Sequence, residues 1–239
     1  MLYLKSSCVL WRSLVRCWHP SVHTASLSDK FLRFTLQLVA RHRQWVNAGL
    51  AARKGGVGGG GEWGLTASSE EFVVLRHDLQ TVAAAIEGPL LLGLLPERLG
   101  PAVPGEVKEM VVGGVREAAA GLRGLSAGLA GVVVDVVAEK CCEVLRQLNG
   151  ITATYRMTNK PLPTRHSHYT AAILQPLTAL LEGSRATVIT PEMRVEVVAR
   201  VTEKVTARFD DMARDLVTRV RGVGGGRGER GGWRVEGGG

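Results

Sequence analysis

The chain has 239 residues and a formal net charge of +8, and 45% of its residues are hydrophobic, so most of it can bury a core. The basic residues are spread along the chain, which excludes a dense basic arm that reads nucleic-acid phosphates. The four cysteines include no Cys-x-x-Cys pair, which argues against a zinc site. No run of about 18 uncharged apolar residues occurs, so we expect no transmembrane helix.

The first 28 residues contain no Asp or Glu and three basic residues, Lys5, Arg12 and Arg16. This composition is typical of a mitochondrial transit peptide. The same segment carries an apolar stripe at helical spacing, formed by Leu4, Cys8, Trp11, Leu14, Val15 and Trp18. The stripe favours an ordinary core helix, and the transit peptide stays as the alternative.

Apolar residues three and four apart predict a long helix over residues 27–52. A Gly-rich flexible loop over about residues 53–66 should follow it. The next helix should begin at Ser68, which has the spacing of a capping box with Glu71. We expect this helix to end at Gly88 and Pro89, with a short turn and a loop up to residue 103.

A further apolar stripe predicts a helix after Pro104, although residues 132–137 are rich in β-branched valine. Several glycines in its first half predict a break or kink between residues 120 and 126. Pro161 and Pro163 then predict a turn over residues 158–164. We expect this turn to pack against neighbouring helices.

Another helix should begin near Ser167 and be kinked by Pro176. The last helix should start with Thr190 as N-cap and Pro191 at its first position, and it should end near residue 221. Phe209 is expected to complete its apolar face. The predicted fold is all-α, an elongated bundle of about six to seven helices over residues 1–221, with a disordered Gly/Arg-rich tail over residues 222–239.

Motifs for catalysis or nucleotide binding, such as Gly-x-Ser-x-Gly, His-Glu-x-x-His and the Walker loop, do not occur in the sequence. His166 and His168 form a pair without further ligands at metal-binding spacing. We therefore predict no enzymatic activity, no cofactor and no metal site. Three arginines in the Gly-rich tail leave a small basic helical nucleic-acid-binding protein as the alternative function.

Two ordered motifs are not explained by helix periodicity. The first comprises Arg16, Cys17 and Trp18, followed by Arg33, Thr35, Leu36, Gln37 and Arg41. The second comprises Tyr155, Arg156, Thr158, Asn159, Lys160, Pro163 and Thr164, followed by Tyr169, Pro176 and Leu177. Their residues, order and spacing resemble the C-terminal region of subunit 2 of the conserved oligomeric Golgi complex.

The resemblance implies a non-catalytic helical scaffold that tethers vesicles in intra-Golgi retrograde transport and supports Golgi organisation. It also implies a peripheral location on the cytosolic face of Golgi membranes. The implied partners are other subunits of the complex, in a lobe with subunits 1, 3 and 4. SNARE proteins, Rab GTPases and coiled-coil tethers are further implied partners, and nucleic acid is not expected. In that family the Arg-Cys-Trp segment is internal, so we expect Met1 to begin a truncated chain.

Overall fold

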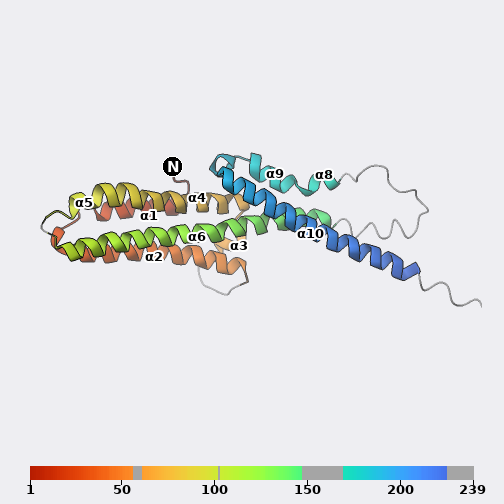
Figure 1. Ribbon diagram of the computed structural model, residues 1–239, viewed down its shortest axis with the longest axis horizontal. Helices are drawn as coiled ribbons and strands as arrows, with labels where there is room; N and C mark the ends of the chain where they lie inside the picture. Colours follow the sequence, from red (N-terminus) through yellow and green to blue (C-terminus); the bar gives the residue numbers. More distant parts are fainter. Residues whose placement is uncertain (56–60, 102, 147–168, 225–239) are drawn as a thin grey trace, which may run out of the picture. The chain divides into compact units, whose positions relative to one another are not determined.

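The computed structural model describes residues 1–55, 61–101, 103–146 and 169–224, with side chains up to residue 218 except that of Tyr169. All regular structure in these ranges is helical, which confirms the predicted all-α class (Figure 1). Among the described residues, six α-helices have seven residues or more: Lys5–Cys17 (α1), Ser28–Arg53 (α2), Ser69–Ala85 (α4), Gly105–Leu145 (α6), Gln175–Glu182 (α9) and Pro191–Gly224 (α10).

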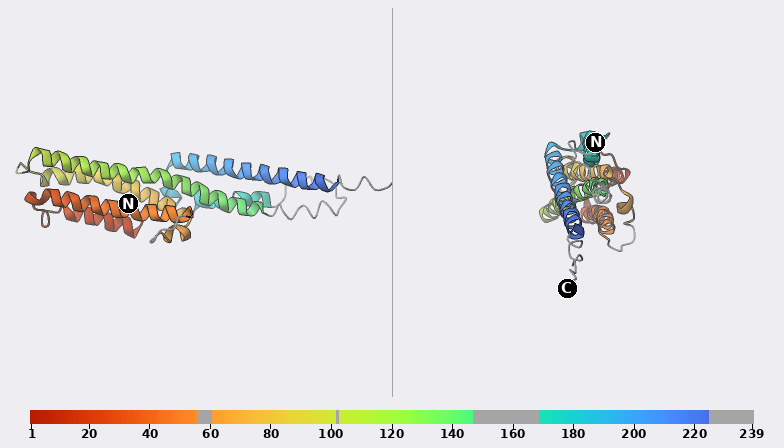
Figure 2. Two further views of the ribbon diagram at one scale, coloured as in Figure 1. Left: turned by 90° about the horizontal axis from the view of Figure 1, so that it is seen from below. Right: turned by 90° about the vertical axis from the view of Figure 1, so that its right-hand side faces the viewer.

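The chain divides into two compact units. Unit 1 comprises Met1–Val136 and Leu180–Val197, and unit 2 comprises Val137–Ala179 and Val198–Gly239. In unit 1, helices α1, α2 and α4 pack side by side, as two views of the ribbon also show (Figure 2). The two units are described separately below.

Helix α1 is a core element of unit 1. Its buried side includes Leu10, Leu14 and Cys17, and Trp18 directly after the helix is fully buried. Two members of the predicted stripe, Trp11 and Val15, are only half-buried, so the buried face is rotated from the predicted one. The carboxylate of Asp78 on α4 accepts hydrogen bonds from the backbone N–H of Tyr3 (3.0 Å) and Leu4 (2.7 Å). A buried side chain from another helix therefore binds amide groups at the start of α1, which would otherwise lack partners.

Helix α2 confirms the prediction for residues 27–52, but the predicted loop at 53–66 is partly wrong. Residues Trp63–Thr66 form a short helix, α3, that packs on α2. The Trp63 ring stacks on Trp45 with centroids 4.5 Å apart, and its Nε1 donates to the Trp45 carbonyl at 3.3 Å. Gly64 lies against Gly49, and a Cβ on either residue would clash. Aromatic stacking and close backbone contact thus order this end of the Gly-rich segment.

Helix α4 begins as predicted, because Ser68 and Glu71 form the complete capping box. The predicted end at Gly88 and Pro89 is wrong. The helix continues as a π-helical segment, Ile86–Leu94, and then as α5, Leu95–Arg98. A π-turn is wider than an α-turn and accommodates the proline, which has no N–H and would clash with a carbonyl of the preceding turn. The segment also buries Ile86, Leu90 and Leu95, which favours the helical path.

Helix α6 confirms that the valine-rich run 132–137 is helical, but the predicted break between residues 120 and 126 does not occur. The fully buried core side chains on this helix include Val111, Val115, Leu122, Leu129 and Val133. Gly114 and Gly121 face α2, since a Cβ at Gly114 would contact Leu32 at 3.5 Å and one at Gly121 would meet the end of the Arg43 side chain at 2.6 Å. An ion pair between Arg123 and Glu87 also joins α6 to the π-helical segment.

The helix predicted to begin near Ser167 is described from Tyr169 onward, and the last helix begins at Pro191 as predicted. Helix α8, Tyr169–Ile173, ends one residue before α9, so the predicted kink at Pro176 appears as a break at Leu174. Thr190 caps α10, because its Oγ1 accepts a hydrogen bond from the Met193 N–H at 3.3 Å. The prediction for Phe209 is wrong: its side chain is 43% exposed, whereas Val201 and Val205 on the same helix are buried.

Two helical stretches, Ser69–Arg98 and Gly105–Leu145, are long and apolar enough to cross a membrane by length and composition alone. Core helices of water-soluble proteins pass the same test. Both stretches bury large apolar side chains, among them Phe72 and Leu79 in the first and Val115 and Leu122 in the second, and the first also carries the buried, hydrogen-bonded Asp78.

Candidate interaction surface

The first sequence motif separates into a buried part and an exposed part. Cys17, Trp18 and Thr35 are buried in unit 1, and the Trp18 Nε1–H donates to the Thr35 Oγ1 at 3.0 Å. The Trp18 ring also contacts the rings of His23 and Phe31. The hydrogen bond joins the end of α1 to α2, so this half of the motif holds two helices together.

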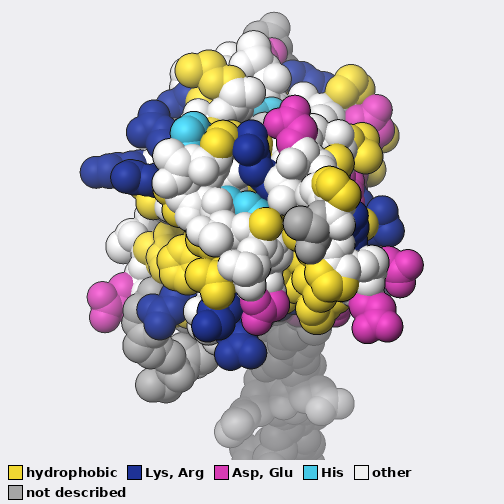
Figure 3. Space-filling model, turned by 90° about the vertical axis from the view of Figure 1, so that its left-hand side faces the viewer, with side chains coloured by type: hydrophobic (Ala, Val, Ile, Leu, Met, Phe, Trp, Pro, Cys, Tyr) yellow, Lys and Arg dark blue, Asp and Glu magenta, His cyan; other side chains and the backbone are white. Residues whose placement is uncertain are grey.

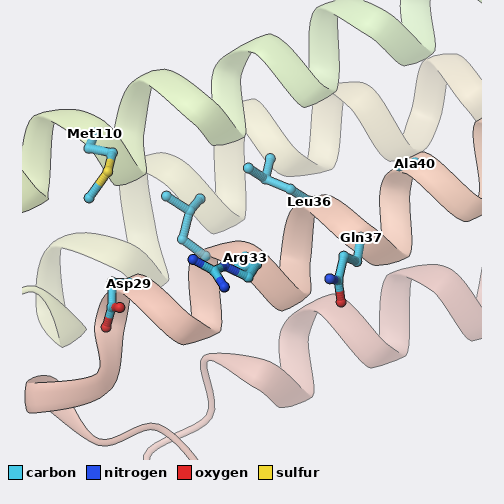
Figure 4. A pocket seen from close by; sticks show the side chains of 7 residues that line it. Asp29, Arg33, Leu36, Gln37, Ala40 and Met110 are labelled. Atoms are coloured by element: carbon cyan, nitrogen blue, oxygen red, sulfur yellow. The ribbon is translucent and has the colours of Figure 1, made fainter.

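The exposed part of the motif lies on the outer side of α2. Arg33, Leu36 and Gln37 line a groove beside α6, and the groove has a volume of about 530 Å³ (Figure 4). Leu32 and Ala40 of α2 and Met110 of α6 contribute apolar surface to the same groove. Arg41 is exposed farther along α2, outside the groove lining, and Arg16 is exposed on α1.

The groove combines an apolar floor with a polar rim. Leu32, Leu36 and Ala40 repeat every four residues, which places them on one side of α2. Met110 is 50% exposed, so its flexible thioether is available for contact. Asp29, Arg33 and Gln37 provide hydrogen-bonding groups on the rim. This arrangement suits an amphipathic helix that inserts apolar side chains and bonds to the rim.

No catalytic chemistry is assembled around this groove. Among the described residues, no group of three His, Cys, Asp or Glu side chains could hold a metal ion. Burial raises the pKa of the Cys17 and Cys141 thiols, which keeps both thiols protonated. Burial lowers the pKa of His42, which Asp78 only partly offsets, and the Nε2 atom of His42 has no hydrogen-bond partner. These groups lie in the interior rather than in a cleft.

The second motif lies largely outside the described residues. The motif residues that lie outside the described ranges are Tyr155, Arg156, Thr158, Asn159, Lys160, Pro163 and Thr164. The predicted turn 158–164 lies outside them as well. Of the remaining members, Tyr169 begins α8, Pro176 is half-buried in α9 and Leu177 is buried. The roles of the motif residues outside the described ranges stay predictions.

Sequence reasoning missed four residues that line the groove: Asp29, Leu32, Ala40 and Met110. The first three could have been found, because the helical period of α2 places them near Arg33 and Leu36. Met110 comes from another helix more than seventy residues later, and no local pattern marks it.

The chain is similar to known proteins over most of its length. Residues 1–224 match the family described as COG complex component, COG2, C-terminal. Similar curated proteins are named conserved oligomeric Golgi complex subunit 2. The Arabidopsis thaliana protein is 37% identical over 223 residues, and the match covers 92% of this chain and 29% of the relative. The Drosophila melanogaster protein is 24% identical, with 87% of this chain and 29% of the relative covered.

The chain thus spans about 29% of the length of these curated relatives. No solved structure matches it. Because the family match extends over both sequence motifs and nearly the whole chain, the chain belongs to the family of the C-terminal region of COG2, a component of the COG complex.

Proposed function

We propose that this chain is a non-catalytic helical scaffold of the conserved oligomeric Golgi complex, acting in vesicle tethering during intra-Golgi retrograde transport and in Golgi organisation. The family match over residues 1–224 carries the proposal. The groove between α2 and α6 supports the scaffold role, because it is lined by Arg33, Leu36 and Gln37 of the first motif, which lie at the surface instead of completing the core.

In this proposal the groove beside α2 binds a helix of another subunit of the complex. Leu32, Leu36 and Met110 would receive apolar side chains of that helix, and Arg33 and Gln37 would set its register through hydrogen bonds. The finer partners are subunits 1, 3 and 4 of the same lobe, and beyond them SNARE proteins, Rab GTPases and coiled-coil tethers. Binding requires no chemical step, only complementary helix faces.

The proposed location is the cytosolic face of Golgi membranes, with peripheral attachment. Supporting this, the two apolar helical stretches bury Phe72, Leu79, Val115 and Leu122 in a protein core. Buried Asp78, which binds the start of α1, would be costly inside a lipid bilayer.

Co-purification of the full-length chain from cells tests the groove. The charge reversal Arg33→Glu and the substitution Met110→Arg should each lower recovery of the other complex subunits, because they alter the rim and the floor. The matched control is Lys30→Glu, an exposed charge reversal on the same helix outside the groove lining. If all three variants recover the other complex subunits equally well, the groove does not bind a subunit of the complex. Recovery of RNA that is lost at high salt, without complex subunits, would instead support the nucleic-acid alternative.

A further inference from the structure

A second surface pocket lies at the C-terminal end of α1, away from the groove lining. Its volume is about 440 Å³, and it is formed by α1 and the turn that follows: Trp11, Arg12, Val15, Arg16, His19, Ser21 and Val22. Arg12, Arg16 and His19 are exposed, whereas Trp11 and Val15 are half-buried and form its apolar side. The proposed function does not use this pocket.

The polar groups of the pocket are arranged to donate hydrogen bonds. The His19 Nδ1 accepts a hydrogen bond from the backbone N–H of Ser21 at 3.2 Å. Neutral His19 must therefore carry its proton on Nε2, where it can donate outward. Arg12 and Arg16 add two guanidinium groups, which only donate. The pocket lining contains no carboxylate, and residues 1–28 contain no Asp or Glu.

Apolar side chains are exposed beside these cations. Val9, three residues before Arg12, is 54% exposed, and Val22 is 43% exposed. The end of unit 1 that carries this turn shows Lys and Arg side chains next to histidine and hydrophobic side chains, with Asp and Glu side chains elsewhere on the same face (Figure 3). Cations mixed with a tryptophan and exposed aliphatic side chains are typical of helices that lie at a membrane interface.

We propose that this pocket binds the phosphate headgroup of an anionic phospholipid, with Arg12, Arg16 and the His19 Nε2 as donors. Trp11 and Val22 then contact the boundary between headgroups and acyl chains. A membrane fits better than RNA, because the exposed apolar side chains have no role in a contact made mainly to phosphates. It fits better than an acidic peptide, because the pocket is short and has only two permanent cations.

The affinity of one such pocket for a membrane is low, since each cation near an anionic surface strengthens binding by only about fivefold. Low affinity is sufficient for a subunit of a multisubunit assembly, because several weak contacts on one complex add by avidity. The inference rests on the proposed function for its setting at a Golgi membrane. The lipid-binding step itself is independent of the groove and can be tested without other subunits.

Vesicle flotation of the full chain tests the pocket directly. The probes are vesicles of phosphatidylcholine alone and vesicles that also contain phosphatidylserine. We expect binding only to the second kind, and the double substitution Arg12→Gln and Arg16→Gln should weaken it by about 25-fold, or fivefold per cation. Trp11→Phe in the intact pocket should reduce the quenching of tryptophan fluorescence by brominated acyl chains, because one quenched indole is removed.

The control removes the same charge elsewhere on unit 1 by the double substitution Lys30→Gln and Arg116→Gln. Both of these side chains are exposed and lie outside the pocket lining. Equal weakening by the two double variants would overturn the proposal, because binding would then follow net charge. Binding of RNA or of an acidic peptide at this pocket without binding to either vesicle would also overturn it. Unchanged recovery of complex subunits with Arg33→Glu and Met110→Arg, together with intact vesicle binding, would refute the groove and leave the lipid site standing.

Discussion

The hydrogen bond between Trp18 and Thr35 offers the sharpest test of how the first motif stabilises unit 1. Thr35→Val replaces the hydroxyl with a methyl group of similar volume and leaves the packing nearly unchanged. Both residues are buried, with exposed fractions of 0% for Trp18 and 1% for Thr35, so water cannot replace the lost acceptor. The indole N–H would then be buried without a partner.

A buried donor without a partner costs about 1–3 kcal/mol, and we expect Thr35→Val to lower the free energy of unfolding by that amount. For a domain of this size, each kcal/mol corresponds to a decrease in Tm of about 2–4 °C. Thermal and urea unfolding followed by circular dichroism would measure both quantities. Thr66→Val is the matched control, because the Thr66 hydroxyl is exposed and bonds only to the nearby Trp63 carbonyl.

A double-mutant cycle with Trp18→Phe isolates the hydrogen bond from the packing of the indole. Once the N–H is removed, Thr35→Val should cost much less than it does in the presence of Trp18. If Thr35→Val destabilises the Trp18→Phe background as strongly as the parent chain, the hydrogen bond does not stabilise the contact between α1 and α2. The reasoning would also fail if Thr66→Val were equally destabilising.

Two further predictions concern buried polar groups of unit 1. Asp78→Ala should lower the free energy of unfolding by about 1.5–3 kcal/mol, because the Tyr3 and Leu4 N–H groups lose a charged acceptor, and amide hydrogen exchange at both positions should accelerate. Unchanged exchange there, or an equal loss with the exposed control Glu117→Ala, would contradict this. For His42, burial lowers the folded-state pKa below the unfolded value of about 6.5, so below that pH the unfolded state binds more protons and stability falls. His42→Leu should therefore lose less stability than the parent chain between about pH 7.5 and 5.5 in urea titrations, and equal losses would contradict the assignment.

Local signals in the sequence determined where several helices begin. The side chains of Ser68 and Thr190 cap α4 and α10, since each accepts a hydrogen bond from a backbone N–H within its own first turn. The apolar period was sufficient to predict α2 and to assign residues 132–137 to a helix. Such features depend on residues close together in the chain, so the sequence alone reveals them.

The same local reasoning failed where packing outweighed intrinsic preference. Pro89 was predicted to end a helix and the glycines near residue 121 to break or kink one, yet both segments remain helical because their apolar side chains are buried in unit 1. Trp63 orders a helical turn beside the Gly-rich segment by stacking on Trp45. Each of these outcomes depends on a neighbour that the local sequence does not show.

For the candidate interaction surface, too, part could be predicted from the sequence and part could not. The motif and the helical period together place Arg33, Leu36 and Gln37 on one side of α2, and a reader of the sequence could have grouped them. Only the tertiary structure shows that Trp18 binds Thr35 in the interior and that Met110 joins the exposed groove. Periodicity determines which residues share a helix face, whereas the packing of helices distant in the chain determines whether that face is buried or free to bind.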